Sequence, residues 1–365
     1  MSKNIKYNFL TTDEKERYQK HLTLKEIGYE GQLSLKNSSV LCIGAGGLGS
    51  SVLLYLAAAG IGKIGIVDND YVEKSNLQRQ IIHETNTIGS LKIDSAQERI
   101  KKFNPNSELL TFAERINPKN ALEIIQKFDI ICDCSDNFGT RYLINDACLI
   151  LNKPLVFGSV QGFEGQVSVF NLNKTSPNLR DLLPESPSKN TVPSCAEYGV
   201  VGVSTGLIGI IQVNEIIKII LKKGEVLDGK IMVFDLLNMN TKKLHLKSDQ
   251  VNKQINNLSK FMDYYSDDEC STQTGTINRI NACDFNSLYK IKPNKILLID
   301  VRENEEFSAS AIDGSISLPL SHLNQKPDLE FIQKESLIKE VFTICKTGKR
   351  SEKASRILSK FKIQS

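Results

Sequence analysis

Residues 40–70, VLCIGAGGLGSSVLLYLAAAGIGKIGIVDND, decide the fold of this chain. An apolar run predicts a buried parallel strand, and a glycine turn that contains Gly44, Gly46 and Gly47 follows it directly. A Leu- and Ala-rich stretch then predicts a helix, and a second apolar run ends at Asp68. Glycines at such a turn let the backbone approach a phosphate, the helix start binds it, and the acidic residue accepts hydrogen bonds from a ribose. The stretch predicts an α/β nucleotide-binding domain, and by itself it favours a nicotinamide or flavin cofactor.

The segment after Asp68 changes that preference toward a triphosphate. It is polar and contains, in order, Ser75, Asn76, Leu77, Gln78 and Arg79. Asn76 and Arg79 can hold phosphate oxygens, and a guanidinium group does so with a planar fork. Lys92, in a helix predicted over residues 88–103, can add a second positive charge, although a lone lysine on a helix is more often only solvated.

A carboxylate follows another predicted buried strand, at residues 128–134. Asp136 and Asn137 come next, before a helix predicted from residue 139 or 140. The carboxyl end of a parallel strand faces the crevice where ligands bind, and carboxylate oxygens suit Mg²⁺. Asp136 is therefore a candidate magnesium ligand, a helix N-cap, or both.

Composition limits the remaining functional classes. The chain has 365 residues, which suggests two or three domains, and a formal net charge of +4 that is too mild for a nucleic-acid surface. The most apolar stretch, residues 200–221, carries Gln212, Asn214, Glu215 and Lys218, so we expect a buried helix and no membrane span. The 8 cysteines have no disulfide-scaffold spacing and no secretory signal is recognisable. We therefore expect a reducing compartment, the cytoplasm or a plastid stroma.

Together these motifs resemble the MoeB/ThiF family of E1-like enzymes, which adenylate the C-terminal glycine of a small ubiquitin-fold sulfur carrier. The resemblance covers about residues 10–248 and rests on GAGGLG, DNDYVEKSNLQRQ, IGSLKIDSA, CSDN and CAEYGV. It implies a Rossmann-like adenylation domain, a homodimer, and ATP with Mg²⁺. By motif position, Gly47 lies against the nucleotide, Asp68 holds the ribose, residues 75–79 and Lys92 hold the phosphates, and Asp136 holds the metal beside Asn137.

Two departures from the family pattern affect what is expected. An early arginine that reaches the partner subunit's ATP is replaced here by Lys20, which keeps the charge and loses the bidentate fork. Many members also bind structural zinc with two CxxC pairs. The first pair should fall near residues 178–181, which read NLRD and contain no cysteine. The second pair should follow Leu246, but the next cysteine after Leu246 is Cys270, so we predict no zinc site.

A second domain is predicted after a polar linker at residues 249–276. Residues 277–365 resemble a rhodanese-like domain, with LLIDVRENEEF as its first signature and CKTGKRS, from Cys345 through Arg350, as its active loop. A strand that runs through this loop into a helix forms an anion nest, which lowers the pKa of a thiol and suits it to carry a persulfide. A cysteine-dependent phosphatase is the local alternative. Rhodanese domains normally continue after this loop and its helix with a further strand, a Gly-Gly turn and a closing helix. This sequence ends at Ser365, so we expect a shortened domain.

The combined expectation is adenylation of a carrier that ends in Gly-Gly, followed by sulfur transfer from a persulfide donor through Cys345. Arg79 and Lys92 would stabilise the charge that develops on the phosphates. Cys195 is a candidate for an acyl thioester or for resolving a disulfide, or is an idle thiol. The molybdopterin synthase small subunit is the first carrier expected, and the thiamine carrier the next. A nucleotide-dependent oxidoreductase and a non-catalytic scaffold for a ubiquitin-fold partner remain alternatives.

Overall fold

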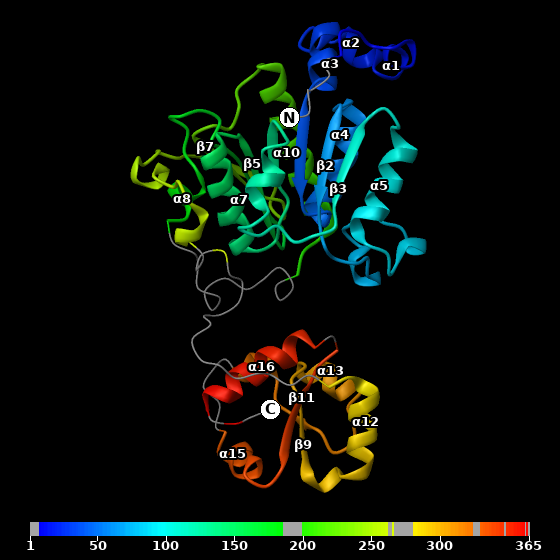
Figure 1. Cartoon of the computed structure of the whole chain (residues 1–365), viewed down its shortest axis with the longest axis vertical. Helices are drawn as coiled ribbons and strands as arrows, with labels where there is room; N and C mark the ends of the chain where they lie inside the picture. Colours follow the sequence, from blue (N-terminus) through cyan, green and yellow to red (C-terminus); the bar gives the residue numbers. More distant parts are fainter. Residues whose placement is uncertain are drawn as a thin grey trace. The chain divides into compact units, whose positions relative to one another are not determined.

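The computed structural model describes residues 7–184, 199–261, 265, 280–323, 329–346, 348–361 and 363. The chain divides into two compact units, residues 1–270 and 271–365, which Figure 1 shows in blue to yellow and in yellow to red. Each unit is an α/β structure built on its own sheet.

The first unit is built on an eight-stranded sheet with the order β3-β2-β1-β4-β5-β6-β7-β8. Its parallel part contains β1 (Ser39–Ile43), β2 (Lys63–Val67), β3 (Glu108–Phe112), β4 (Ile130–Asp133) and the start of β5 (Leu155–Gln161). Because these strands are parallel, their carboxyl ends share one edge of the sheet, which we call the carboxyl edge. The sheet continues with antiparallel β6 (Glu164–Phe170), β7 (Lys230–Asp235) and β8 (Asn240–His245).

Helices cover both faces of this sheet, so every parallel strand in its middle is buried. One face packs on α4 (Gly47–Ala59), α5 (Lys92–Phe103) and α10 (Gly202–Leu221). The other packs on α6 (Ala121–Ile125) and α7 (Phe138–Leu151), with the short helix α8 (Leu179–Leu182) beside them. Alternate residues of β1 face the two layers: Val40 and Cys42 face α4, whereas Leu41 and Ile43 face α7.

Helix α10 is long and apolar enough by composition to cross a membrane, but its polar side chains are used inside the fold. Buried Gln212 donates from Nε2 to the Asp133 carbonyl oxygen at 2.8 Å. Buried Glu215 accepts from the Leu227 N–H at 2.9 Å. These contacts support the prediction of a buried core helix.

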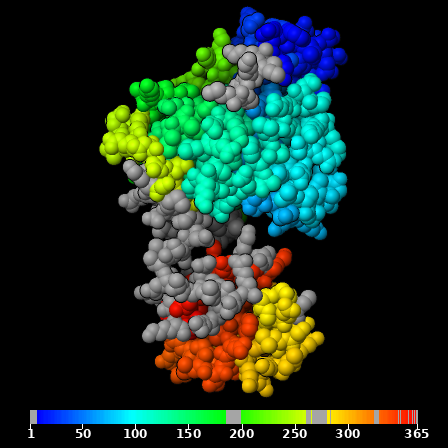
Figure 2. Space-filling view, viewed as in Figure 1, coloured from blue at the N-terminus to red at the C-terminus, as the bar shows by residue number. Residues whose placement is uncertain are grey.

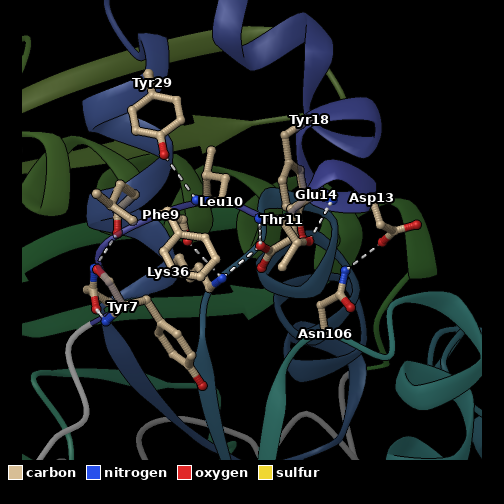
Figure 3. A network of polar contacts seen from close by, with 12 residues as sticks. Tyr7, Phe9, Leu10, Thr11, Asp13, Glu14, Tyr18, Tyr29, Lys36 and Asn106 are labelled. Atoms are coloured by element: carbon tan, nitrogen blue, oxygen red, sulfur yellow. Dashed lines mark hydrogen bonds and ion pairs between the residues drawn. The ribbon is translucent and has the colours of Figure 1, made fainter.

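The N-terminal segment forms α1 (Thr12–Arg17), α2 (Gln19–Thr23) and α3 (Gly28–Lys36), at the end of the sheet where β1 begins (Figure 1). In the space-filling view of Figure 2 this segment is the dark blue region at one end of the first unit. The chain breaks at Tyr18 between α1 and α2, and Thr11 caps α1 through a capping box with Glu14. Lys36 of α3 fixes the start of the segment, because its Nζ donates to Glu14 Oε2 at 2.7 Å and to the Phe9 carbonyl oxygen at 3.2 Å (Figure 3).

Part of the stretch predicted as a linker at residues 249–276 packs into the first unit. Ile255, Leu258 and Tyr265 are buried, and the 3₁₀ turns η3 (Val251–Lys253) and η4 (Leu258–Phe261) lie between residues 249 and 262. Apolar side chains at these positions make this stretch part of the folded unit, since their burial stabilises it.

The second unit has a parallel three-stranded sheet in the order β10-β9-β11. Its strands are β9 (Ile296–Asp300), β10 (Ile316–Ser317) and β11 (Glu340–Ile344). Its helices are α12 (Ala282–Ile291), α13 (Asn304–Ala309), α14 (Leu320–Leu323), α15 (Glu330–Ser336) and α16 (Lys349–Lys360). The buried β9 divides its side chains between two clusters, Leu297 and Ile299 toward α16 and Ile296 and Leu298 toward α12.

Candidate active site

The glycine turn joins β1 to α4 at the carboxyl edge and has little room for side chains. Gly44 has a φ of +103°, and a Cβ on it would lie 2.8 Å from the Cys134 carbonyl oxygen. A Cβ on Gly49 would lie 2.0 Å from the Gly44 carbonyl oxygen. Gly46 is the N-cap of α4 and supplies no side-chain cap, so N–H groups at this helix start stay available to a phosphate.

Asp68, the predicted ribose ligand, follows β2 and is fixed against this turn. Its Oδ2 accepts from the Ala45 N–H at 2.8 Å, and its Oδ1 accepts from the Asp70 N–H at 2.8 Å. The carboxylate therefore holds the turn and lies beside the place where a ribose would sit.

Lys92, predicted to bind phosphate, is the first residue of α5 and is buried. Its Nζ lies 3.0 Å from Asp70 Oδ2, and its N–H donates to the Asp70 carbonyl oxygen at 2.9 Å. The Asp70 side chain is largely exposed. The structure thus brings Lys92, Asp68 and the glycine turn together through Asp70, which the sequence analysis did not single out.

The segment that contains Ser75, Asn76, Leu77, Gln78 and Arg79 forms the 3₁₀ turn η1 (Lys74–Asn76) and the residues just after it. Asn76 is buried and its Oδ1 accepts from the Glu73 N–H at 3.0 Å, so this amide oxygen shapes the turn itself. The Arg79 Nη1 donates to the Ser75 carbonyl oxygen at 3.2 Å. Gly202 at the start of α10 lies against this segment, because a Cβ there would be 2.4 Å from the Gln78 carbonyl oxygen.

Asp136 follows β4 at the same edge and is exposed. Asn137, not Asp136, is the N-cap of α7, and its Oδ1 accepts from the Thr140 N–H at 2.8 Å. The carboxylate of Asp136 is therefore free of a capping role, and an exposed oxygen ligand at this edge fits Mg²⁺. Asp133, the last residue of β4, is fully buried, which raises the pKa of its carboxyl.

One predicted residue that the structure describes, Lys20, is not at this edge. Lys20 is exposed on α2, next to Tyr18, whose ring lies against Gly60 before β2 begins. That is the opposite edge of the sheet, so Lys20 does not join the glycine turn within its own chain. Cys195 lies outside the described residues.

The zinc ligand pattern of the resemblance does not fit the residues present. Where the first pair was expected, Asp181 Oδ1 accepts from the Asp249 N–H at 2.8 Å and from Asn252 Nδ2 at 2.9 Å. Beside it, buried Arg180 makes a bidentate pair with Asp146, at 3.0 Å from Nε to Oδ1 and 2.6 Å from Nη2 to Oδ2. Direct polar contacts thus join the two stretches to which the resemblance assigns the zinc ligands. We call the residues that make these contacts the polar clasp: Asp146, Arg180, Asp181, Asp249, Asn252 and Tyr265.

The second unit presents Cys345 at the end of β11, just before α16. The Ser351 N–H, in the first turn of that helix, donates to the Cys345 Sγ at 3.3 Å. A cavity of ≈ 290 Å³ opens beside the thiol and is lined by Asp300, Arg302, Ser310, Ala311, Ile312, Ile344, Cys345 and Lys346. Of the cysteines whose side chains are described, Cys345 is the one that is not buried, and burial raises the pKa of thiols such as Cys148.

Arg350, the last residue of the predicted active loop, makes a bidentate pair with Glu306 of α13, with 2.8 Å from Nη2 to Oε1. Hydrogen bonding to Arg350 lowers the pKa of Glu306 to about 2. The sequence analysis did not single out Glu306, although it lies in the signature LLIDVRENEEF.

Comparisons with known proteins agree with both units. The ThiF family matches residues 18–255, and the rhodanese-like domain matches residues 286–364. A probable adenylyltransferase/sulfurtransferase MoeZ of Mycobacterium tuberculosis is 39% identical over 358 residues, which cover 96% of this chain and 90% of that protein. A probable molybdopterin-synthase adenylyltransferase of Porphyra purpurea is 40% identical, with 95% and 89% covered.

Solved structures agree on the fold. The crystal structure of E. coli MccB with ATP has a TM-score of 0.58 at 20% identity and covers 66% of this chain and 74% of that one.

A further sequence relative names both activities. The adenylyltransferase and sulfurtransferase MOCS3 of Aedes aegypti is 38% identical over 365 residues, which cover 96% of this chain and 83% of that protein. The oxidoreductase and phosphatase alternatives have no support in these likenesses. The chain belongs to the ThiF family, and it is an adenylyltransferase that carries a rhodanese-like sulfurtransferase domain.

Proposed function

We propose that this enzyme uses ATP to adenylate the C-terminal glycine of a small ubiquitin-fold sulfur carrier that ends in Gly-Gly, and then directs sulfur to the activated carboxyl. The molybdopterin synthase small subunit is the first candidate carrier, in line with the name of the relative from Porphyra purpurea. The observation that carries the proposal is the joining of glycine turn, Asp68 and Lys92 at one edge of the sheet by short hydrogen bonds.

In the first reaction a carrier carboxylate oxygen bonds to the α-phosphorus of ATP, and pyrophosphate leaves with the electron pair of the broken bond. The α4 start and the glycine turn hold phosphate oxygens, while Asp68 orients the ribose. Arg79 and Lys92 place positive charge near the negative charge that builds up on the leaving pyrophosphate. Asp136 would hold Mg²⁺, which supplies further charge neutralisation when it is bound.

In the second reaction a persulfide on Cys345, loaded by a persulfide donor, attacks the acyl-adenylate and AMP leaves. The product is an acyl disulfide on Cys345. A second thiol, for which Cys195 is the candidate, then attacks the Cys345 sulfur; this releases the carrier thiocarboxylate and leaves a disulfide that an external thiol reductant reopens. The Ser351 N–H and the α16 helix start support a thiolate or persulfide at Cys345.

We also propose that the enzyme works as a homodimer in which Lys20 serves the nucleotide of the partner subunit. Lys20 lies at the edge opposite to its own glycine turn, so a second copy would be needed to bring it to a phosphate. Exposed apolar side chains on the packed helices α4 and α10, namely Tyr55, Val203 and Ile210, offer surface for such an association.

Exchange of labelled pyrophosphate into ATP tests the adenylation proposal. The whole chain should catalyse exchange only with a carrier that ends in Gly-Gly, and deletion of those two glycines is the matched control. A chain that binds the carrier and leaves ATP unlabelled would be a scaffold, and the proposal would fail.

A further inference from the structure

His83 lies behind the glycine turn and belongs to none of the predicted site residues. It is 5% exposed. Its Nε2 is 3.0 Å from the Ala45 carbonyl oxygen, and its Nδ1 is 3.0 Å from the Ser95 Oγ. It therefore spans the distance between the phosphate-binding turn and helix α5.

The partners define which ring nitrogen carries the proton. A carbonyl oxygen can only accept, so Nε2 must donate to Ala45. Burial lowers the pKa of His83, the Ala45 hydrogen bond opposes that shift, and the charges of Lys92 and Asp68 act in opposite senses. The ring is therefore neutral near pH 7, and its unprotonated Nδ1 faces the Ser95 Oγ, which also lies 3.0 Å from the Thr87 Oγ1.

The Ala45 peptide group is held on both sides as a result. Its N–H donates to Asp68, and its carbonyl oxygen accepts from His83. The Asp70 N–H donates to the other oxygen of Asp68, and the Asp70 carboxylate pairs with Lys92.

Helix α5 completes this connection. Lys92 and Ser95 lie one turn apart in α5, and Ser95 bonds to His83. The contacts thus form a closed ring that runs from the glycine turn through Asp68, Asp70, Lys92 and Ser95 to His83 and back. Small errors in the position of a charged group relative to a reacting phosphate are costly in rate, which gives such a ring a function.

We propose that His83 is a positioning residue for adenylation, because it sets the phosphate-binding turn at a fixed place relative to Lys92. It does not touch the nucleotide; it acts through the Ala45 carbonyl oxygen and Ser95. This inference rests on the proposed ATP site and adds a residue to it.

Two substitutions separate the two bonds of the ring. His83→Gln can place an N–H near the position of Nε2 and keep the bond to Ala45. His83→Asn places its polar atoms near Nδ1, so it can keep Ser95 and loses Ala45. His245→Asn, in the exposed strand β8, is the matched control.

The assay is carrier-dependent ATP–pyrophosphate exchange by the whole chain, with kcat and the KM for ATP measured beside the melting temperature. We expect His83→Asn to lower kcat about tenfold, as the loss of one positioning hydrogen bond predicts. His83→Gln should recover most of that loss, and His245→Asn should match the unchanged protein.

The inference is overturned if His83→Asn and His83→Gln lose rate equally, or if rates across the set simply follow the melting temperature. Either result would mean that His83 only packs the fold. Lack of exchange by the unchanged chain would overturn the proposed function as well, whereas normal exchange by His83→Asn would overturn this inference alone.

Discussion

At the scale of single residues, Lys92 carries the sharpest prediction about the first reaction. Its charge is buried at the carboxyl edge, and its only contact partner of opposite charge in the described part of the chain is Asp70. Lys92→Ala should lower kcat/KM for exchange about 100-fold, because a preorganised charge beside the leaving pyrophosphate is lost. Lys101→Ala, on the exposed face of the same helix, is the control, and equal losses in both variants would contradict the role.

Cys345 carries the prediction about the second reaction. Cys345→Ala should abolish formation of the carrier thiocarboxylate, which mass spectrometry detects as a gain of one sulfur in exchange for oxygen. Exchange of pyrophosphate should stay within about twofold of the unchanged chain, since the two units fold around separate cores. Thiocarboxylate made by the variant would show that another thiol carries the sulfur.

Single residues also mark what could be predicted from the sequence. Asp68 and Lys92 were recognisable because the spacing of motifs on a βαβ unit places them at one edge. His83 and Glu306 were not, because their roles depend on contacts across the fold: His83 meets Ala45, and Glu306 meets Arg350. No local pattern of charge or hydrophobicity encodes a contact between residues 38 or 44 positions apart.

At the scale of elements, strands and helices with strong apolar patterns were predicted within a few residues. Helix α5 begins at Lys92, later than the residue 88 expected, because residues 85–87 form the 3₁₀ turn η2 (Thr85–Thr87) first. Strands β7 and β8 were missed, since β8 is exposed along its whole length and reads as a polar segment. Residues 249–261 read as a linker for a different reason: their scattered apolar side chains have no regular period.

The polar clasp yields a prediction at this scale. The Tyr265 hydroxyl donates to Asp146 Oδ2 at 2.7 Å, and burial together with the Asp146 charge raises the pKa of this tyrosine. Arg180→Ala leaves Asp146 buried without its partner and should cost about 3–5 kcal/mol of unfolding free energy. Tyr265→Phe should cost about 1–2 kcal/mol, and Tyr71→Phe, at an exposed position, close to none.

The same clasp predicts how the enzyme responds to chelators. A unit joined by Asp181, Asp249 and Asn252 directly should keep its melting temperature in 1,10-phenanthroline, and elemental analysis of the purified chain should find no stoichiometric zinc. A chelator-sensitive melting temperature would show that a metal, and not the polar contacts, joins these stretches.

At the scale of the whole molecule, the position of Lys20 makes the subunit arrangement testable. Heterodimers of a Lys20→Ala chain and a Lys92→Ala chain, isolated through two different tags, have one site with both lysines intact if Lys20 acts across the interface. They should therefore recover about half of the unchanged exchange rate, although each variant alone is impaired. If Lys20 acted within its own chain, both sites would lack one lysine and no rate would return.

The control is a heterodimer of an unchanged chain with a chain that carries both Lys20→Ala and Lys92→Ala. If Lys20 acts across the interface, neither site of this heterodimer is complete; if Lys20 acts within its own chain, one site is complete. A purely monomeric chain in light scattering would remove the arrangement altogether, because the edge that carries Lys20 lies opposite to the glycine turn that it would have to serve.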